Sequence, residues 1–252
     1  LRKPHLSKNE QTSFLFTYTA SYLIPSLNFV HDNSLWGFTA PIDGTRYRFD
    51  VLIAPGVYNS NLKFYSFLGD YRTYFRFWNT YSFAFRLAGG LSGGSNPQRF
   101  FIGGTSNWIN RHFATHSIPI KSVSDFAFLT AALPLRGYDY AQEIGTKYAL
   151  MNLELRFPLI EYLLTGALPI LFRNIRGVLF FDAGSAWNQN RKLRLFERNG
   201  NGFIVTKDLL MGTGVGARIF LFSFLVKFDL AWAYNYHSFS KPKFYISLGA
   251  DF

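Results

Sequence analysis

The chain has 252 residues, of which 19% are aromatic and only 16% are charged, and it carries a net charge of +11 with no cysteine. Its longest apolar runs contain Pro134 and Pro169 and fall short of the roughly 20 residues that a membrane-spanning helix needs. Disulfides and cysteine metal sites are excluded. An aromatic-rich, helix-poor composition favours a transmembrane β-barrel over a soluble β-sandwich or a soluble barrel.

Segments of alternating polarity follow one another along the chain. About ten of them place an apolar residue at every second position and are separated by turn residues. They are residues 13–22, a weaker segment at 26–36, then 46–54, 61–78, 80–91, 147–157, 177–187, 209–221, 224–235 and 244–252. Residues 41–44 predict a turn before the third segment. The sequence thus predicts an all-β, antiparallel barrel.

Alternation gives each predicted strand two faces, because successive side chains point to opposite sides. In residues 224–235 one face is apolar, while Lys227 and Asp229 lie on the other. The same phasing predicts further inward-facing polar residues: Asn152, Glu154, Arg156, Asp182 and Arg218. The basic residues are scattered, so we interpret the positive charge as contacts to anionic lipid head groups and a polar lumen, not as a nucleic-acid-binding surface.

The last nine residues predict a strand that closes the chain. The side chains expected on its lipid face are Phe244, Ile246, Leu248, Ala250 and Phe252, and those expected on its lumen face are Tyr245, Ser247, Gly249 and Asp251. Gly249 lacks a side chain and is expected to weaken or kink this edge. A closing strand that ends on Phe resembles the carboxy-terminal sorting signal of bacterial outer-membrane barrels.

Residues 92–146 interrupt the regular succession of predicted strands and turns. The segment contains Gly, Pro, Asn and His, shows only weak strand patterns near 100–102 and 126–133, and carries large side chains such as Trp108 and Phe113. Loops of this length are usually functional or disordered. We therefore interpret residues 1–252 as one barrel domain, with 92–146 as a long extracellular or lumen loop within it.

A specific resemblance begins at the end of that loop, where the sequence reads Leu135-Arg136-Gly137-Tyr138. Four further patterns follow in order: residues 152–159 (NLELRFPL), 180–187 (FFDAGSAW), 214–218 (GVGAR) and a final Phe-x-x-x-x-Gly-x-x-Phe. Together they resemble the barrel of the BamA/TamA-type superfamily of surface antigen D15-like proteins, which is related to two-partner-secretion transporters. In that family the Arg-Gly-Phe/Tyr motif lies on a loop folded back into the lumen.

The resemblance implies a role for each matching residue. Arg136 would reach inward-facing carboxylates, with Asp182 as the first partner and Glu154 as the second. Gly137 would allow a tight turn, and Tyr138 would hold the tip of the loop by packing. Without the resemblance, the isolated Arg-Gly-Tyr tripeptide favours a solvated loop arginine at Arg136.

The resemblance also implies a larger barrel. Members of the family have about sixteen strands, preceded by periplasmic domains, whereas about ten strands are recognised here. We therefore interpret the chain as the carboxy-terminal part of such a barrel, integral to the bacterial outer membrane.

The function implied is the insertion and folding of other outer-membrane proteins through a lateral seam at the last strand. The partners would be unfolded outer-membrane protein clients, outer-membrane lipids or lipopolysaccharide, and accessory lipoproteins. Two alternatives remain: a two-partner-secretion type transporter, and a passive outer-membrane pore. We expect no enzyme activity, cofactor or metal; the spacing of His112 and His116 suits zinc only on a helix, which the local sequence does not predict.

Overall fold

The computed structural model describes residues 23–57, 62–78, 80–114, 129–164, 171–221 and 224–252. Within these ranges the chain forms strands and irregular segments, and none of it forms a helix long and apolar enough to cross a membrane. The strand predicted at residues 13–22 lies outside the described residues.

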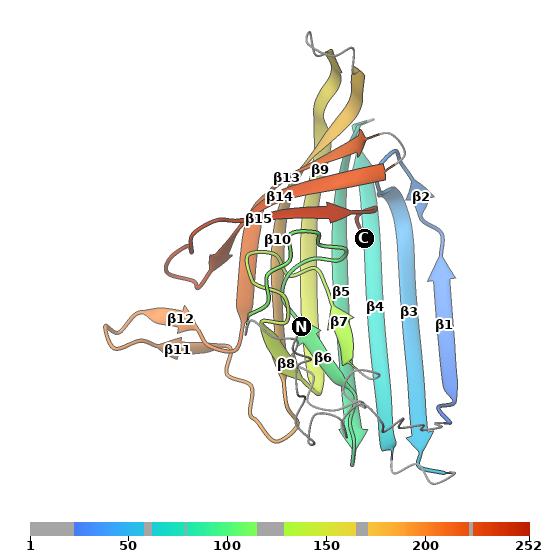
Figure 1. Ribbon diagram of the computed structural model, residues 1–252, viewed down its shortest axis with the longest axis vertical. Coiled ribbons are helices and arrows are strands. Elements are labelled where there is room, and N and C mark those ends of the chain that lie inside the picture. Colours follow the sequence, from blue (N-terminus) through green and yellow to red (C-terminus); the bar gives the residue numbers. More distant parts are fainter. Residues whose placement is uncertain (1–22, 58–61, 79, 115–128, 165–170, 222–223) are drawn as a thin grey trace, which may run out of the picture.

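A single ten-stranded sheet forms a curved wall (Figure 1). Its order is β1-β3-β4-β5-β9-β10-β13-β14-β15, with β2 paired to β3, and all of these pairs are antiparallel. The strands are β1 Ser26–Asp32, β2 Leu35–Trp36, β3 Pro41–Pro55, β4 Lys63–Phe77, β5 Tyr81–Gly94, β9 Lys147–Leu164, β10 Leu171–Trp187, β13 Leu210–Leu221, β14 Phe224–Tyr234 and β15 Lys243–Leu248. In this order β1 and β15 are the two ends of the sheet.

The described parts of the long segment between β5 and β9, residues 95–114 and 129–146, fold against the inner face of the wall (Figure 1). It contains a three-stranded sheet of β6 Arg99–Ile102, β7 Leu129–Ala132 and β8 Glu143–Gly145. Phe100, Ile102 and Leu135 from this segment form a buried cluster with Tyr148 and Leu150 of β9. A separate hairpin of β11 Phe196–Arg198 and β12 Ile204–Thr206 projects to one side of the wall.

The alternation predicted from the sequence is confirmed by the exposure of the side chains. Large apolar side chains on the outer face are exposed, among them Phe49, Ile53, Phe67, Phe75, Leu87, Leu179 and Val215. The predicted inward polar residues are buried: Asn152, Glu154, Arg156, Asp182, Arg218, Lys227 and Asp229. Exposed aromatic and aliphatic groups on one face of a sheet suit contact with lipid.

Two local predictions are wrong. Residues 41–44 do not form a turn but begin β3, because Asp43 and Pro41 pair with β2 across a register shift. The last strand ends at Leu248 instead of running to the end of the chain. Gly249 has a φ of +97°, which favours glycine, and beyond it the chain turns to the inner face. Phe252 was expected on the lipid face, but its ring centroid lies 5.5 Å from the Arg156 guanidinium.

Candidate functional site

The predicted loop motif lies at the centre of the inner face. Leu135 is fully buried and exchanges two backbone hydrogen bonds of 2.9 Å with Gly104, which ties the motif to the segment after β6. Gly137 follows with a φ of +98°. An atom at its Cβ position would lie 2.8 Å from the backbone nitrogen of Ala233 on β14. The turn at Gly137 thus needs glycine both for its conformation and for its close approach to the wall.

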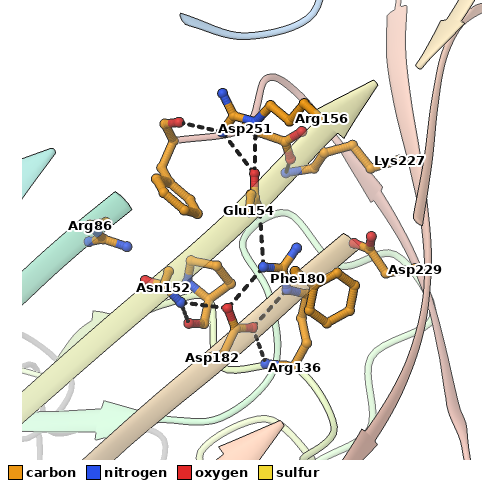
Figure 2. A network of polar contacts seen from close by, with 12 residues as sticks. Arg86, Arg136, Asn152, Glu154, Arg156, Phe180, Asp182, Lys227, Asp229 and Asp251 are labelled. Carbon is orange, nitrogen blue, oxygen red and sulfur yellow. Dashed lines mark hydrogen bonds and ion pairs between the residues drawn. The ribbon is translucent and has the colours of Figure 1, made fainter. Parts of the chain in front are cut away.

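The Arg136 side chain is held by two carboxylates on neighbouring strands (Figure 2). Its Nε and Nη2 atoms donate to the two oxygens of Asp182 on β10, at 2.7 and 2.9 Å, and Nη2 lies 2.9 Å from Oε1 of Glu154 on β9. The backbone N–H of Arg136 also donates to Asp182 at 2.9 Å. All three side chains are at most 2% exposed. This fork of parallel bonds suits the planar guanidinium, and a buried charge needs such pairing.

The surroundings keep Arg136 charged. Burial alone lowers the pKa of the guanidinium, but the charges of Asp182 and Glu154 outweigh it and hold the pKa well above its usual range. The guanidinium carbon also lies 3.6 Å from the centroid of the Phe180 ring, a cation–π contact. Arg136 therefore acts as a permanent cation at every physiological pH.

The wall is shaped to receive the backbone of the motif. A Cβ atom built on Gly212 of β13 would overlap the carbonyl oxygen of Arg136. The absence of a side chain at Gly212 therefore lets the loop lie directly on the sheet. The loop backbone occupies the space that the missing side chain of Gly212 leaves.

Two further wall residues hold the loop just before the motif. Asn152 of β9 donates from Nδ2 to the carbonyl of Pro134 and to Asp182, both at 2.8 Å. Arg86 of β5 donates to the carbonyl of Leu133 and pairs with Asp70 on β4. The sequence placed Asn152 on the inner face but gave no signal for these contacts, since backbone carbonyls carry no sequence pattern.

The last strand also holds the motif, through Tyr245. Its hydroxyl accepts from the N–H of Gly137 and donates to the carbonyl of Tyr138, both at 2.8 Å. The Tyr138 hydroxyl in turn donates to the carbonyl of Met211 on β13 at 3.0 Å. Burial raises the pKa of Tyr138 to about 12, so this hydroxyl remains a donor. Tyr245 was predicted to face inward, but not as a contact of the loop.

A second ion-pair cluster involves the residues after β15. Arg218 of β13 contacts Asp229 at 2.7 Å and Asp251 at 2.6 Å. Arg156 pairs with Glu154 and donates to the carbonyl of Phe252, both at 2.8 Å. Arg136 and Glu154 from the first cluster and Asp229 and Asp251 from the second line a cavity of about 350 Å³, together with Arg72, Arg86, Lys227 and Phe252.

The remaining predicted residues of the last strand lie at the end of the sheet. Phe244 is 49% exposed, as expected for the lipid face. On the side of β15 away from β14, the N–H of Ile246 donates to the Asn110 side chain, and the N–H of Leu248 donates to the carbonyl of Asn107. His112 lies in an irregular segment beside Trp108, whereas His116 lies outside the described residues.

Comparisons with known proteins agree with this arrangement. A family model described as the Omp85 superfamily domain matches residues 10–252. The chain is similar in structure to the crystal structure of BamA from Haemophilus ducreyi lacking POTRA domains 1–3, with a TM-score of 0.53 and 17% sequence identity. The match covers 90% of this chain and 42% of that one, so the chain spans less than half the length of its structural relative. A comparison with curated proteins gave no match.

Proposed function

The chain belongs to the Omp85 superfamily of outer-membrane β-barrels, and from that premise we propose that it inserts and folds other outer-membrane proteins through a seam at β15. The observation that carries the proposal is the position of β15. It ends the order of the described sheet, and the backbone groups of Ile246 point away from β14. An end strand of this kind is a template for another strand.

The mechanism follows from strand addition. A client segment would pair with the edge of β15 by backbone hydrogen bonds, and its alternating side chains would set the register. No bond is made or broken covalently, so we propose no enzyme activity and no cofactor. The driving force is the folding free energy of the client, which satisfies its backbone only as its own strands pair.

The lumen loop would keep the wall in shape while the seam is used. Arg136 joins the loop to β9 and β10, and Tyr245 joins the same stretch of loop to β15. The strand at the seam therefore rests on a fixed support and not only on β14. The packing of the loop on the inner face does not favour a passive pore.

We propose three kinds of partner. Unfolded outer-membrane proteins would be the clients, and outer-membrane lipids or lipopolysaccharide would surround the exposed apolar face. Accessory lipoproteins would deliver or position clients.

The test is the folding rate of a client barrel added unfolded to vesicles that contain the purified protein. Ile246→Pro removes a backbone N–H that β14 does not use, so the sheet should persist while the edge is blocked. The proposal predicts faster folding with the wild-type protein and a rate near that of empty vesicles with Ile246→Pro. The matched control is Val30→Pro, at an exposed position of β1, which is the other end of the described sheet. An undiminished rate with Ile246→Pro contradicts the proposal.

A further inference from the structure

Three arginines lie side by side on the inner face of the wall, toward the β1 end of the sheet. Arg46 of β3 is the register partner of Arg72 on β4, and Arg72 is the register partner of Arg86 on β5. We call these three residues the arginine row. Side chains directly opposite each other on antiparallel strands have Cβ atoms about 4.5–5.5 Å apart, and like charges in such positions repel. The arginine row therefore needs negative charge beside it.

The carboxylates of the chain supply part of that charge. Asp70 accepts from Nε and Nη2 of Arg72 at 2.6 and 3.0 Å, and from Nε and Nη2 of Arg86 at 3.0 and 2.6 Å. One carboxylate thus serves two guanidinium groups. At the end of the row, Asp32 lies 3.6 Å from Arg46, and these two side chains are 36% and 37% exposed. Among the described residues, the three cations of the row therefore have two carboxylate partners.

A cavity of about 350 Å³ lies beside this row. Arg72 and Arg86 line it from β4 and β5, Lys227 lines it from β14, and Thr105 and Ser106 line it from the lumen loop. Its volume is at the low end of the range of small-molecule sites, about 300–1,000 Å³. The cavity therefore has room for a phosphate-sized group together with part of the molecule that carries it.

Lys227 brings a buried ammonium group to the far side of the cavity. Its side chain is 8% exposed, and Nζ lies 3.4 Å from the carbonyl oxygen of Ala250 and 3.6 Å from Asp251. Both distances are long for hydrogen bonds from an ammonium group, which has three N–H donors. Arg86 and Lys227 lie on opposite sides of Glu154 (Figure 2), as the order of β5, β9 and β14 in the sheet requires. A buried charge is costly without close pairing, so this ammonium suits a further acceptor in the cavity.

The carboxylates that line the cavity are already paired with cations. Glu154 is paired with two arginines, and Asp229 and Asp251 share Arg218 at 2.7 and 2.6 Å. The cluster at Arg136 holds two arginines and two carboxylates, and the cluster at Arg218, counted with its lysine, holds two cations and two carboxylates. The excess of positive side chains is therefore confined to the arginine row.

We propose that this cavity binds a phosphate group between the arginine row and Lys227, with Thr105 and Ser106 as further donors from the lumen loop. The planar guanidinium group suits bidentate recognition of phosphate oxygens, and the lysine ammonium binds phosphate as a point charge. The ligand would join β4 and β5 to the lumen loop and to β14. Binding would therefore stabilise the folded barrel, because the unfolded chain has no such site.

The first experiment measures binding by calorimetry to the purified protein in a maltoside detergent, which contains no phosphate. The two probes are inorganic phosphate and glycerophosphoglycerol, the water-soluble head group of phosphatidylglycerol. Tighter saturable binding of inorganic phosphate assigns the site to free phosphate, and tighter binding of the diester assigns it to a lipid head group. The absence of saturable binding for both probes overturns the proposal.

Variants on two sides of the cavity locate the bound phosphate. Arg72→Gln leaves Asp70 paired with Arg86, and Lys227→Met keeps the length of the side chain without its charge. Each should weaken binding of the better probe at least about tenfold, because a hydrogen bond from a charged group is lost. Arg198→Gln, on the exposed strand β11, removes one positive charge far from the cavity lining and should leave the affinity unchanged. Equal affinities in all these variants overturn the proposal.

The second experiment measures unfolding by urea in the same detergent and needs no client protein, so its result is independent of the proposed function. Inorganic phosphate should raise the unfolding midpoint of the wild-type protein and of Arg198→Gln, and the rise should grow with the logarithm of its concentration above the dissociation constant. Arg72→Gln should lose this rise. An equal rise with potassium chloride at the same ionic strength would show general screening of charge and would contradict the proposal.

Discussion

Two of the regions in which the lumen loop contacts the wall are built from different chemistry. At Arg136 the contact is a buried cation between two carboxylates, with both partners almost completely removed from water. At residues 107–110 the contact is a set of neutral hydrogen bonds to the edge of β15. A buried ion pair is costly to separate because each charge is left without a partner, whereas a neutral bond can be exchanged. The first region suits a fixed anchor, and the second suits an exchangeable contact.

The largest effect is expected from Arg136→Ala. The change leaves Asp182 and Glu154 buried beside each other without their cation, which should destabilise the folded barrel by about 3–5 kcal/mol. The midpoint of urea unfolding in detergent micelles measures it. Arg136→Lys keeps the charge but not the fork of hydrogen bonds, so its urea midpoint should lie between those of the wild-type protein and Arg136→Ala. Arg198→Ala on the exposed β11 strand should change stability by less than about 0.5 kcal/mol.

Gly212→Ala tests the same anchor from the side of the wall. The added methyl group overlaps the carbonyl oxygen of Arg136, so the loop must shift, at a cost of about 1–3 kcal/mol in the free energy of unfolding. Gly200→Ala is the matched control, because a Cβ there meets no atom within 4 Å. Equal unfolding midpoints for the two variants would show that the loop does not rest on β13.

Tyr245→Phe removes the hydroxyl that joins the loop to the last strand. The N–H of Gly137 loses its acceptor, so we expect a loss of about 1–2 kcal/mol. Protection of the Gly137 amide against hydrogen exchange should fall while that of Leu135, which pairs with Gly104, persists. Tyr71→Phe, on the outer face, should affect neither measurement; unchanged protection of Gly137 in Tyr245→Phe would contradict the assignment.

Asn110→Ala should have the smallest effect on global stability, below about 1 kcal/mol, because water replaces its neutral hydrogen bonds at an edge. Hydrogen exchange at the amide of Ile246 should nevertheless become faster, since this N–H donates to Asn110. A destabilisation as large as that of Arg136→Ala would remove the distinction between the two regions.

The inner-face residues could be predicted because a strand has a period of two. Glu154, Asp182 and Arg218 each alternate with apolar neighbours, so their direction follows from the sequence alone. The prediction that Arg136 pairs with Asp182 and Glu154 needed the resemblance as well, because side chains in a loop do not alternate regularly between two faces. That resemblance supplied the order of motifs, and the strand phasing supplied the face.

The contacts at the end of the sheet could not be predicted. Residues 107–110 have no alternation, and their hydrogen bonds to β15 join positions more than a hundred residues apart. The inward turn after Leu248 depends on Gly249, which was expected to kink the edge, and on the ion pair of Asp251 with Arg218. Phe252 was misplaced because a period of two was continued past the residue where the strand stops.

Disulfide trapping of a client during insertion tests the central claim most directly. Ile246→Cys places a single cysteine on the edge of β15, and Leu179→Cys places one on the outer face of the central strand β10, in a chain without native cysteine. A client with one cysteine in an end strand is added unfolded to vesicles containing either variant. The account predicts a disulfide-linked adduct with Ile246→Cys and almost none with Leu179→Cys; equal adducts, or none at Ile246, would contradict it.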